Sequence, residues 1–135
     1  MNDVLNGTFV PTAGVPMTRE QKMQGRRHLV DALLQVYAQG QDKRLVWQGT
    51  RTDLVEALHL IYIYGDIRDE YGELEHFKRL VHHFFTLFDL KTPINPHALL
   101  RNASKRQVSF LDRYCWLLFE GREEKPLGKW MKTVD

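Results

Sequence analysis

The amino-acid sequence predicts a mainly helical, compact domain with one short strand or hairpin, of the helix-turn-helix type. Apolar residues recur three and four positions apart in several segments, most of which are bounded by helix-capping residues and glycines. One short segment alternates apolar and polar residues, which is typical of a strand. The 135 residues, of which 43% are hydrophobic, can bury one core of ordinary size.

The residue pattern divides the chain into three regions. Residues 1–17 contain glycines and prolines without periodicity, so we expect a flexible N-terminal arm. Residues 18–121 contain every helical pattern and form the predicted domain. Residues 122–135 are expected to be a C-terminal tail that packs loosely or frays, because they are polar apart from Leu127, Trp130 and Met131.

The first half of the domain predicts two helices that flank a strand. Thr18 and Gln21 form a capping box, and the helix behind it ends at Gly40 after an apolar stripe of Val30, Leu33, Leu34 and Tyr37. In the predicted strand, Leu45 and Trp47 share one side. Thr50 or Thr52 caps a second helix that ends at Gly65 and turns inward Leu54, Leu58 and Ile61.

The second half of the domain predicts three further helices. The core helix has a stripe of Leu74, Phe77, Val81, Phe84 and Phe88. Asn95 as cap and Pro96 as first residue open a short helix that runs to about Arg101. Ser104 and Gln107 form a second capping box, and the last helix ends at Gly121 and buries Val108, Leu111, Cys115 and Leu118.

The spacing of reactive residues indicates no enzyme, no cofactor and no metal. His76 and His83 lie two helical turns apart, ~10.5 Å, whereas two ligands of one metal need a spacing of three or four residues. No phosphate loop, nucleophile elbow or metalloprotease motif occurs. Asp53 and Glu56 fit a helix N-terminus better than a catalytic pair. Cys115, the single cysteine, is expected to be an inert core thiol in a cytoplasmic protein, and no apolar run suggests a membrane span.

Charge is unevenly distributed along the chain although the formal net charge is only +2. Residues 18–51 carry seven basic and three acidic side chains, residues 52–90 carry three and eight, and residues 91–135 carry nine and five. If the two basic stretches fold onto one face, they form a surface that binds polyanions. A mixed, solvated surface is the alternative.

The segment from Asn95 to Phe119 predicts a helix-turn-helix, in which a recognition helix presents its first residues to the major groove. The residues expected on base edges are Lys105, Arg106, Gln107 and Ser109. Those expected on phosphates are Lys43, Arg44, Arg51, Arg101, Ser104 and Arg113. The alternative is that these are ordinary solvent-facing residues at a helix start.

Four segments, in order, also carry a family resemblance. They are LVWQGT at 45–50, followed by DLVE; FFTLFDL at 84–90; the basic residues Arg101, Lys105 and Arg106; and FLD at 110–112. With them, the stretch Lys43–Phe119 resembles the RteC family, DNA-binding regulators of conjugative transposons that activate excision genes. The family's Arg-Thr pair before the last tripeptide is replaced here by Gln107-Val108.

The resemblance implies a winged-helix type, C-terminal DNA-binding domain of a longer regulator, and residues 1–42 leave room only for an arm and one helix. The sequence therefore predicts a transcriptional regulator domain whose partner is double-stranded DNA, with a homodimer as a further option and no small-molecule substrate. The competing prediction is a protein-interaction module that binds no DNA. In that case exposed Trp130, Met131 or an acidic face of the third helix would dock a protein partner.

Overall fold

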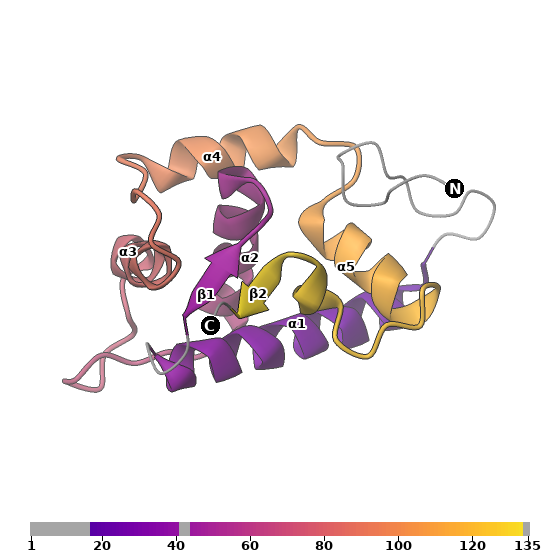
Figure 1. Ribbon diagram of the computed structural model, residues 1–135, viewed down its shortest axis with the longest axis horizontal. Coiled ribbons are helices and arrows are strands. Elements are labelled where there is room, and N and C mark those ends of the chain that lie inside the picture. Colours follow the sequence, from indigo (N-terminus) through magenta and orange to yellow (C-terminus); the bar gives the residue numbers. More distant parts are fainter. Residues whose placement is uncertain (1–16, 41–43, 134–135) are drawn as a thin grey trace.

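The computed structural model describes residues 17–40 and 44–133. Within these ranges the chain forms five α-helices, one 3-10 helix and a two-stranded antiparallel sheet (Figure 1). The mainly helical prediction is therefore confirmed. The elements are α1 (Arg19–Gln39), β1 (Leu45–Trp47), α2 (Arg51–Tyr64), α3 (Phe77–Leu87), α4 (Pro96–Ser104), α5 (Phe110–Phe119), η1 (Pro126–Lys129) and β2 (Met131–Thr133). None of the described helices is long and apolar enough to cross a membrane.

Capping fixes the bounds of the first two helices as predicted. In α1 the Thr18 hydroxyl accepts the Gln21 N–H and the Gln21 amide oxygen accepts the Thr18 N–H, both at 3.0 Å. The helix ends at Gly40, whose φ of 58° lies in the region that favours glycine. Thr50, rather than Thr52, caps α2, with Asp53 as the reciprocal partner.

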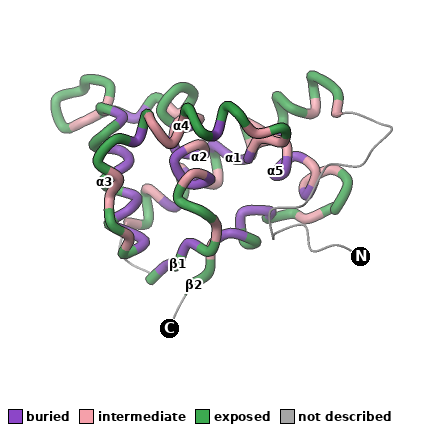
Figure 2. The backbone as a smooth tube through the Cα atoms, turned by 90° about the horizontal axis from the view of Figure 1, so that it is seen from above, coloured by how far each residue is buried: buried purple, intermediate pink, exposed green. Residues whose placement is uncertain are grey.

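Helix α2 is the centre of the fold, because it contacts α1, α3, α4 and α5. Figure 2 shows it largely as a buried segment. Helices α4 and α1 lie on opposite sides of it (Figure 1). The completely buried residues of α2 are Leu54, Val55, Ala57, Leu58 and Ile61.

The short strands pair far-apart parts of the chain. Leu45 lies opposite Thr133 and Trp47 opposite Met131, and Leu45 and Trp47 are buried while Val46 is exposed, as the alternation predicts. Because β2 is the partner strand, the prediction of a loose C-terminal tail is wrong.

Aromatic packing explains the order of this C-terminal segment. Trp130 is only 3% exposed, and its ring centroid lies 4.6 Å from that of Phe110. The Gln48 N–H donates to the Trp130 carbonyl at 2.6 Å. Trp130 is therefore part of the core, and the hypothesis that it is exposed to dock a partner is also wrong.

The third helix is shorter than its stripe suggested. Leu74 is 56% exposed and precedes α3, in an isolated bridge with Arg68, whereas the stripe from Phe77 to Phe88 is buried. The acidic residues Asp66, Asp69, Glu70, Glu73 and Glu75 also precede α3, and its own exposed positions hold basic or polar residues such as Lys78 and Arg79. The expected acidic face of this helix does not exist.

Helices α1 and α5 approach closely where Gly25 meets Cys115. A Cβ added to Gly25 would lie 2.2 Å from the Cys115 sulfur, so only glycine fits there. Cys115 is buried, as predicted, and burial raises the pKa of its thiol to about 11. The thiol is therefore protonated at neutral pH.

We expect Gly25→Ala to lower the free energy of unfolding by about 1 kcal/mol or more, because overpacking against Cys115 outweighs the gain in helix propensity. In a Cys115→Ala background the same substitution should cost less, since the sulfur is gone. Urea unfolding of the four proteins gives this coupling energy. Equal costs of Gly25→Ala in both backgrounds would contradict the packing argument.

Candidate nucleic-acid interface

The turn between α4 and α5 differs from the predicted recognition-helix start. Helix α4 continues to Ser104, whose hydroxyl donates to the Arg101 carbonyl at 2.7 Å, and Lys105 is its C-cap. The predicted capping box of Ser104 with Gln107 does not form. Ser109 caps α5 instead, and its hydroxyl accepts the Asp112 N–H at 3.0 Å. Residues 105–108 are thus a connecting turn, and α5 starts at Phe110.

The face that α5 buries is also rotated from the predicted one. Its buried residues include Phe110, Tyr114, Leu117 and Arg113, whereas Val108, Leu111 and Leu118 are only partly buried. Cys115 alone of the predicted stripe is fully buried. The single basic side chain of α5 therefore points into the protein, so α5 offers no cation to DNA.

Arg106 and Arg113 both donate to one carboxylate oxygen, Oδ1 of Asp53. Arg106 also lies 3.7 Å from Glu56 Oε1, and a second nitrogen of its guanidinium donates to the Thr50 hydroxyl at 3.4 Å. The Glu56 oxygen Oε2 accepts the Phe110 N–H at 2.9 Å. These four charged residues, Asp53, Glu56, Arg106 and Arg113, form a cluster that joins the start of α2 to the α4–α5 turn and to α5.

Burial and pairing act in opposite directions within this charged cluster. Burial by itself would raise the pKa of Asp53, but the hydrogen bonds and charges of Arg113 and Arg106 outweigh it and lower that pKa. For Glu56, burial dominates over its Phe110 hydrogen bond and the arginine charges, so its pKa is raised. Glu56 Oε1 and Arg113 Nε have no hydrogen-bond partner. Asp53 is therefore the anion that neutralises the two arginines.

Three residues predicted to contact DNA serve the fold instead. Arg113 is 9% exposed and paired with Asp53, so it cannot reach a phosphate, and Ser109 caps α5. The guanidinium of Arg106 pairs with Asp53 and Glu56, and its side chain is only 28% exposed. These assignments are corrections, and their common cause is the pair of carboxylates on α2, which the sequence analysis assigned to the helix dipole alone.

Other predicted contacts remain available to a ligand. Arg101, Ser104, Lys105 and Gln107 are exposed on α4 and the turn. Arg51 is exposed at the start of α2 and donates to the Lys91 carbonyl at 2.9 Å, which places it at the end of α2 that Arg106 also contacts.

The remaining two predicted phosphate contacts are not part of this surface. Arg44 is exposed but lies at the opposite end of β1 from the start of α2. Lys43 lies outside the described residues.

The exposed side of α4 also holds two residues that the sequence analysis missed, His97 and Asn102. His97, Arg101 and Lys105 are spaced four residues apart and therefore share one side of the helix. Asn102 follows Arg101 on the adjoining part of that side. The four-residue spacing within Asn95–Lys105 could have indicated this exposed side of α4. It was overlooked because Ser104 was taken as the start of the next helix.

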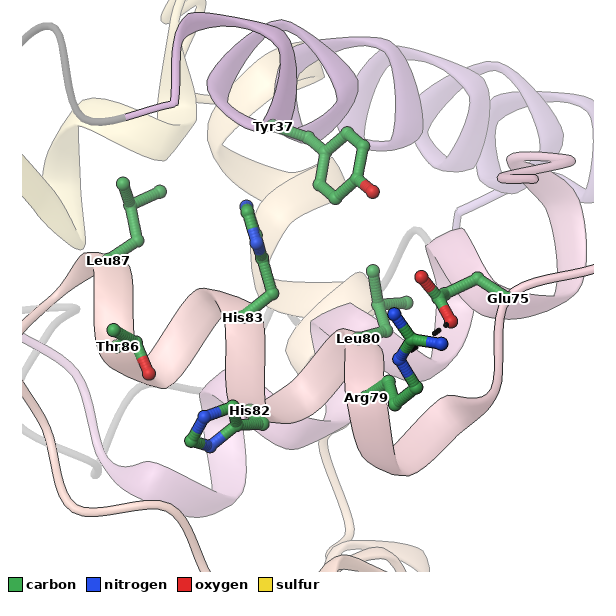
Figure 3. A pocket seen from close by; sticks show the side chains of 8 residues that line it. All are labelled: Tyr37, Glu75, Arg79, Leu80, His82, His83, Thr86 and Leu87. Carbon is green, nitrogen blue, oxygen red and sulfur yellow. Dashed lines mark ion pairs between the residues drawn. The ribbon is translucent and has the colours of Figure 1, made fainter. Parts of the chain in front are cut away.

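The neighbouring histidines of α3, His82 and His83, point to different sides of the helix (Figure 3). Figure 3 shows His83 pointing toward Tyr37 and His82 pointing to another side of the helix, as their adjacency predicts. His83 borders a pocket of about 270 Å³, in which Arg79 and Glu75 pair with each other at 3.5 Å. Burial lowers the pKa of His83, so it is neutral at pH 7. Among the described residues no three His, Cys, Asp or Glu side chains are grouped to hold a metal ion.

We expect Asp53→Asn to lower the free energy of unfolding by about 3–5 kcal/mol, because it leaves Arg113 buried without an anion. The amide oxygen of asparagine can still accept the Thr50 N–H, so the loss of stability reports mainly on the missing charge. Asp66→Asn is the control, since its carboxylate is paired on the surface with Arg68. Urea unfolding measures both variants, and similar small losses would show that the cluster does not hold α5 in place.

Glu56→Gln should change the pH dependence of stability. Because the pKa of Glu56 is raised above its ordinary 4.5, the folded chain keeps a proton that the unfolded chain has lost. Its contribution is fully present below pH 4.5 and is lost as pH rises through the raised pKa. The variant cannot ionise at this position, so we expect its stability relative to the wild type to increase as pH rises above 4.5. Urea unfolding across this range should give a difference that grows with pH, not a constant one.

No family model, no curated protein and no solved structure matches this chain. The resemblance to the RteC family therefore stays a prediction from the sequence.

Proposed function

We propose that the chain is a regulatory domain that binds double-stranded DNA through the exposed side of α4 and the α4–α5 turn. The observation that carries the proposal is a continuous set of exposed basic and amide side chains on one helix at the edge of the fold (Figure 1). They are His97, Arg101, Asn102, Lys105 and Gln107.

The geometry of α4 suits the major groove. An α-helix with its side chains is about 10–12 Å across, and the major groove is about 12 Å wide, so a helix of nine residues can lie in it. One side of the helix packs on α2, and His97 at its start also lies against Phe77 of α3, with ring centroids 5.3 Å apart, whereas Arg101, Asn102 and Lys105 are exposed. Arg101 can donate two hydrogen bonds to guanine, and Asn102 can pair with adenine. We assign these two side chains to base edges.

The cations around α4 are suited to phosphate contacts. Lys105 ends the helix, and Arg51 with Lys91 marks the neighbouring end of α2. The carboxylates nearest to this end, Asp53 and Glu56, are buried or nearly so and face Arg106 and Arg113. Their charge is therefore compensated inside the protein rather than presented to DNA. A role in mobile-element excision, as in the RteC family, is part of this proposal and rests on the sequence resemblance.

We expect the wild-type domain to prefer the duplex upstream of its own gene over a scrambled duplex, and its affinity to fall about 100-fold between 50 and 200 mM salt if four phosphates are contacted. Arg101→Ala should weaken the free energy of binding to the upstream duplex by about 1–3 kcal/mol and reduce the preference for it over the scrambled duplex. Lys105→Ala should weaken binding to both duplexes equally and reduce the slope of log affinity against log salt concentration by about one. Fluorescence anisotropy of labelled duplexes measures all three quantities.

The control is Arg27→Ala, which removes an exposed cation from α1, on the other side of α2. It should leave affinity and preference unchanged. The proposal fails if the wild type binds neither duplex at 50 mM salt, or if Arg27→Ala weakens binding as much as Arg101→Ala does. Binding that does not respond to salt would instead favour a protein-interaction module.

A further inference from the structure

A groove of about 520 Å³ lies between α1 and the C-terminal segment that contains η1 and β2. From α1, residues at three- and four-residue spacing line it, so that one side of this helix faces the groove over three turns. From the C-terminal segment, Glu124 to Thr133 form the other wall. The volume falls within the range of sites for small organic ligands, roughly 300–1,000 Å³.

The floor of the groove is apolar and fixed by the core. Leu45 and Leu127 are buried, and Val36 and Met131 lie beside them. One polar pair interrupts this floor, because the Tyr114 hydroxyl lies 2.7 Å from His28 Nδ1. Tyr114 is fully buried, so the hydrogen bond also holds the His28 ring at the wall. A ligand would therefore meet a preformed apolar surface.

The free charges around the groove are mainly negative. Asp31 and Glu124 both line it, and neither has an ion pair or hydrogen bond among the described residues, while Lys125 is the basic side chain that lines it. Lys132 lies between Met131 and Thr133 in β2 and therefore points to the other face of the sheet, and Arg44, which precedes β1, is not among the residues that line the groove. The groove also borders the last turn of α1, which has no basic residue and whose dipole favours a cation.

We propose that this groove binds a small organic cation, an apolar chain or ring with one protonated amino group. The apolar part lies on Val36, Leu45 and Leu127, and the amino group lies between Asp31 and Glu124. Helix α1, which forms one wall of the groove, lies on the side of the fold opposite to α4 (Figure 1), and the proposed ligand binding is independent of DNA binding.

The test compares three probes of one shape: 4-phenylbutylamine, 4-phenylbutan-1-ol and 4-phenylbutyrate. Each is titrated into the isotope-labelled chain, and amide chemical shifts in NMR spectra report both the affinity and the site. We expect the amine to bind with Kd of about 0.1–1 mM, as its size allows, and to bind more tightly than the alcohol, with the acid weakest. The shifts should lie on α1 and the C-terminal segment.

Substitutions separate the charge from the apolar floor. The double substitution Asp31→Asn with Glu124→Gln should weaken binding of the amine about three- to tenfold and leave binding of the alcohol unchanged. The matched control, Glu70→Gln with Glu73→Gln, removes two charges elsewhere and should change neither. Ala32 lies in the groove wall, so Ala32→Trp should abolish binding of both the amine and the alcohol. A thermal unfolding curve checks that this variant folds.

Equal binding of amine, alcohol and acid would overturn the proposal. So would an amine affinity that the Asp31 and Glu124 substitutions do not change, or shifts that lie outside the groove. None of these outcomes depends on DNA, so a failure here is distinguishable from a failure of the proposed DNA contact.

Discussion

Asp53 accepts hydrogen bonds from Arg106 and Arg113 while its second oxygen faces the Thr50 N–H at 3.4 Å. One carboxylate therefore ties the N-terminal end of the central helix to a turn and to a helix more than 50 positions later in the chain. Arg113 is buried, so this link is required once α5 packs on α1 and α2. The position of the α4–α5 turn, and with it the end of α4, depends on this contact.

The same contact decides which side chains can meet a ligand. It buries Arg113, holds the partly exposed Arg106 against Asp53, and pairs the charge of Asp53 inside the protein. Arg101 and Lys105, only a few positions earlier, are exposed, because they lie outside the contact of α4 with α2. The candidate surface therefore belongs to the first helix of the pair rather than to the second, and charge content alone does not locate it.

Local chemistry could be predicted from the sequence because its causes lie within a few residues. The capping box of Thr18, a threonine cap at the start of α2, the positive φ of Gly40 and the alternation of Leu45 and Trp47 each involve neighbours in the chain. Proline at the start of α4 acts in the same way. The mainly helical fold follows from such signals.

The second half of the candidate site could not be predicted, because its causes are long-range. Ser104 and Ser109 are each followed three positions later by a side chain able to complete a cap, and local preference does not choose between them. The choice falls on Ser109 because Phe110 is then placed against Trp130 and its N–H meets Glu56. Trp130 in turn is held by its carbonyl to Gln48, next to β1. Since the C-terminal segment looked like a polar tail, the partner that sets the start of α5 was hidden, and the cap of the helix was placed at Ser104, five residues before Ser109.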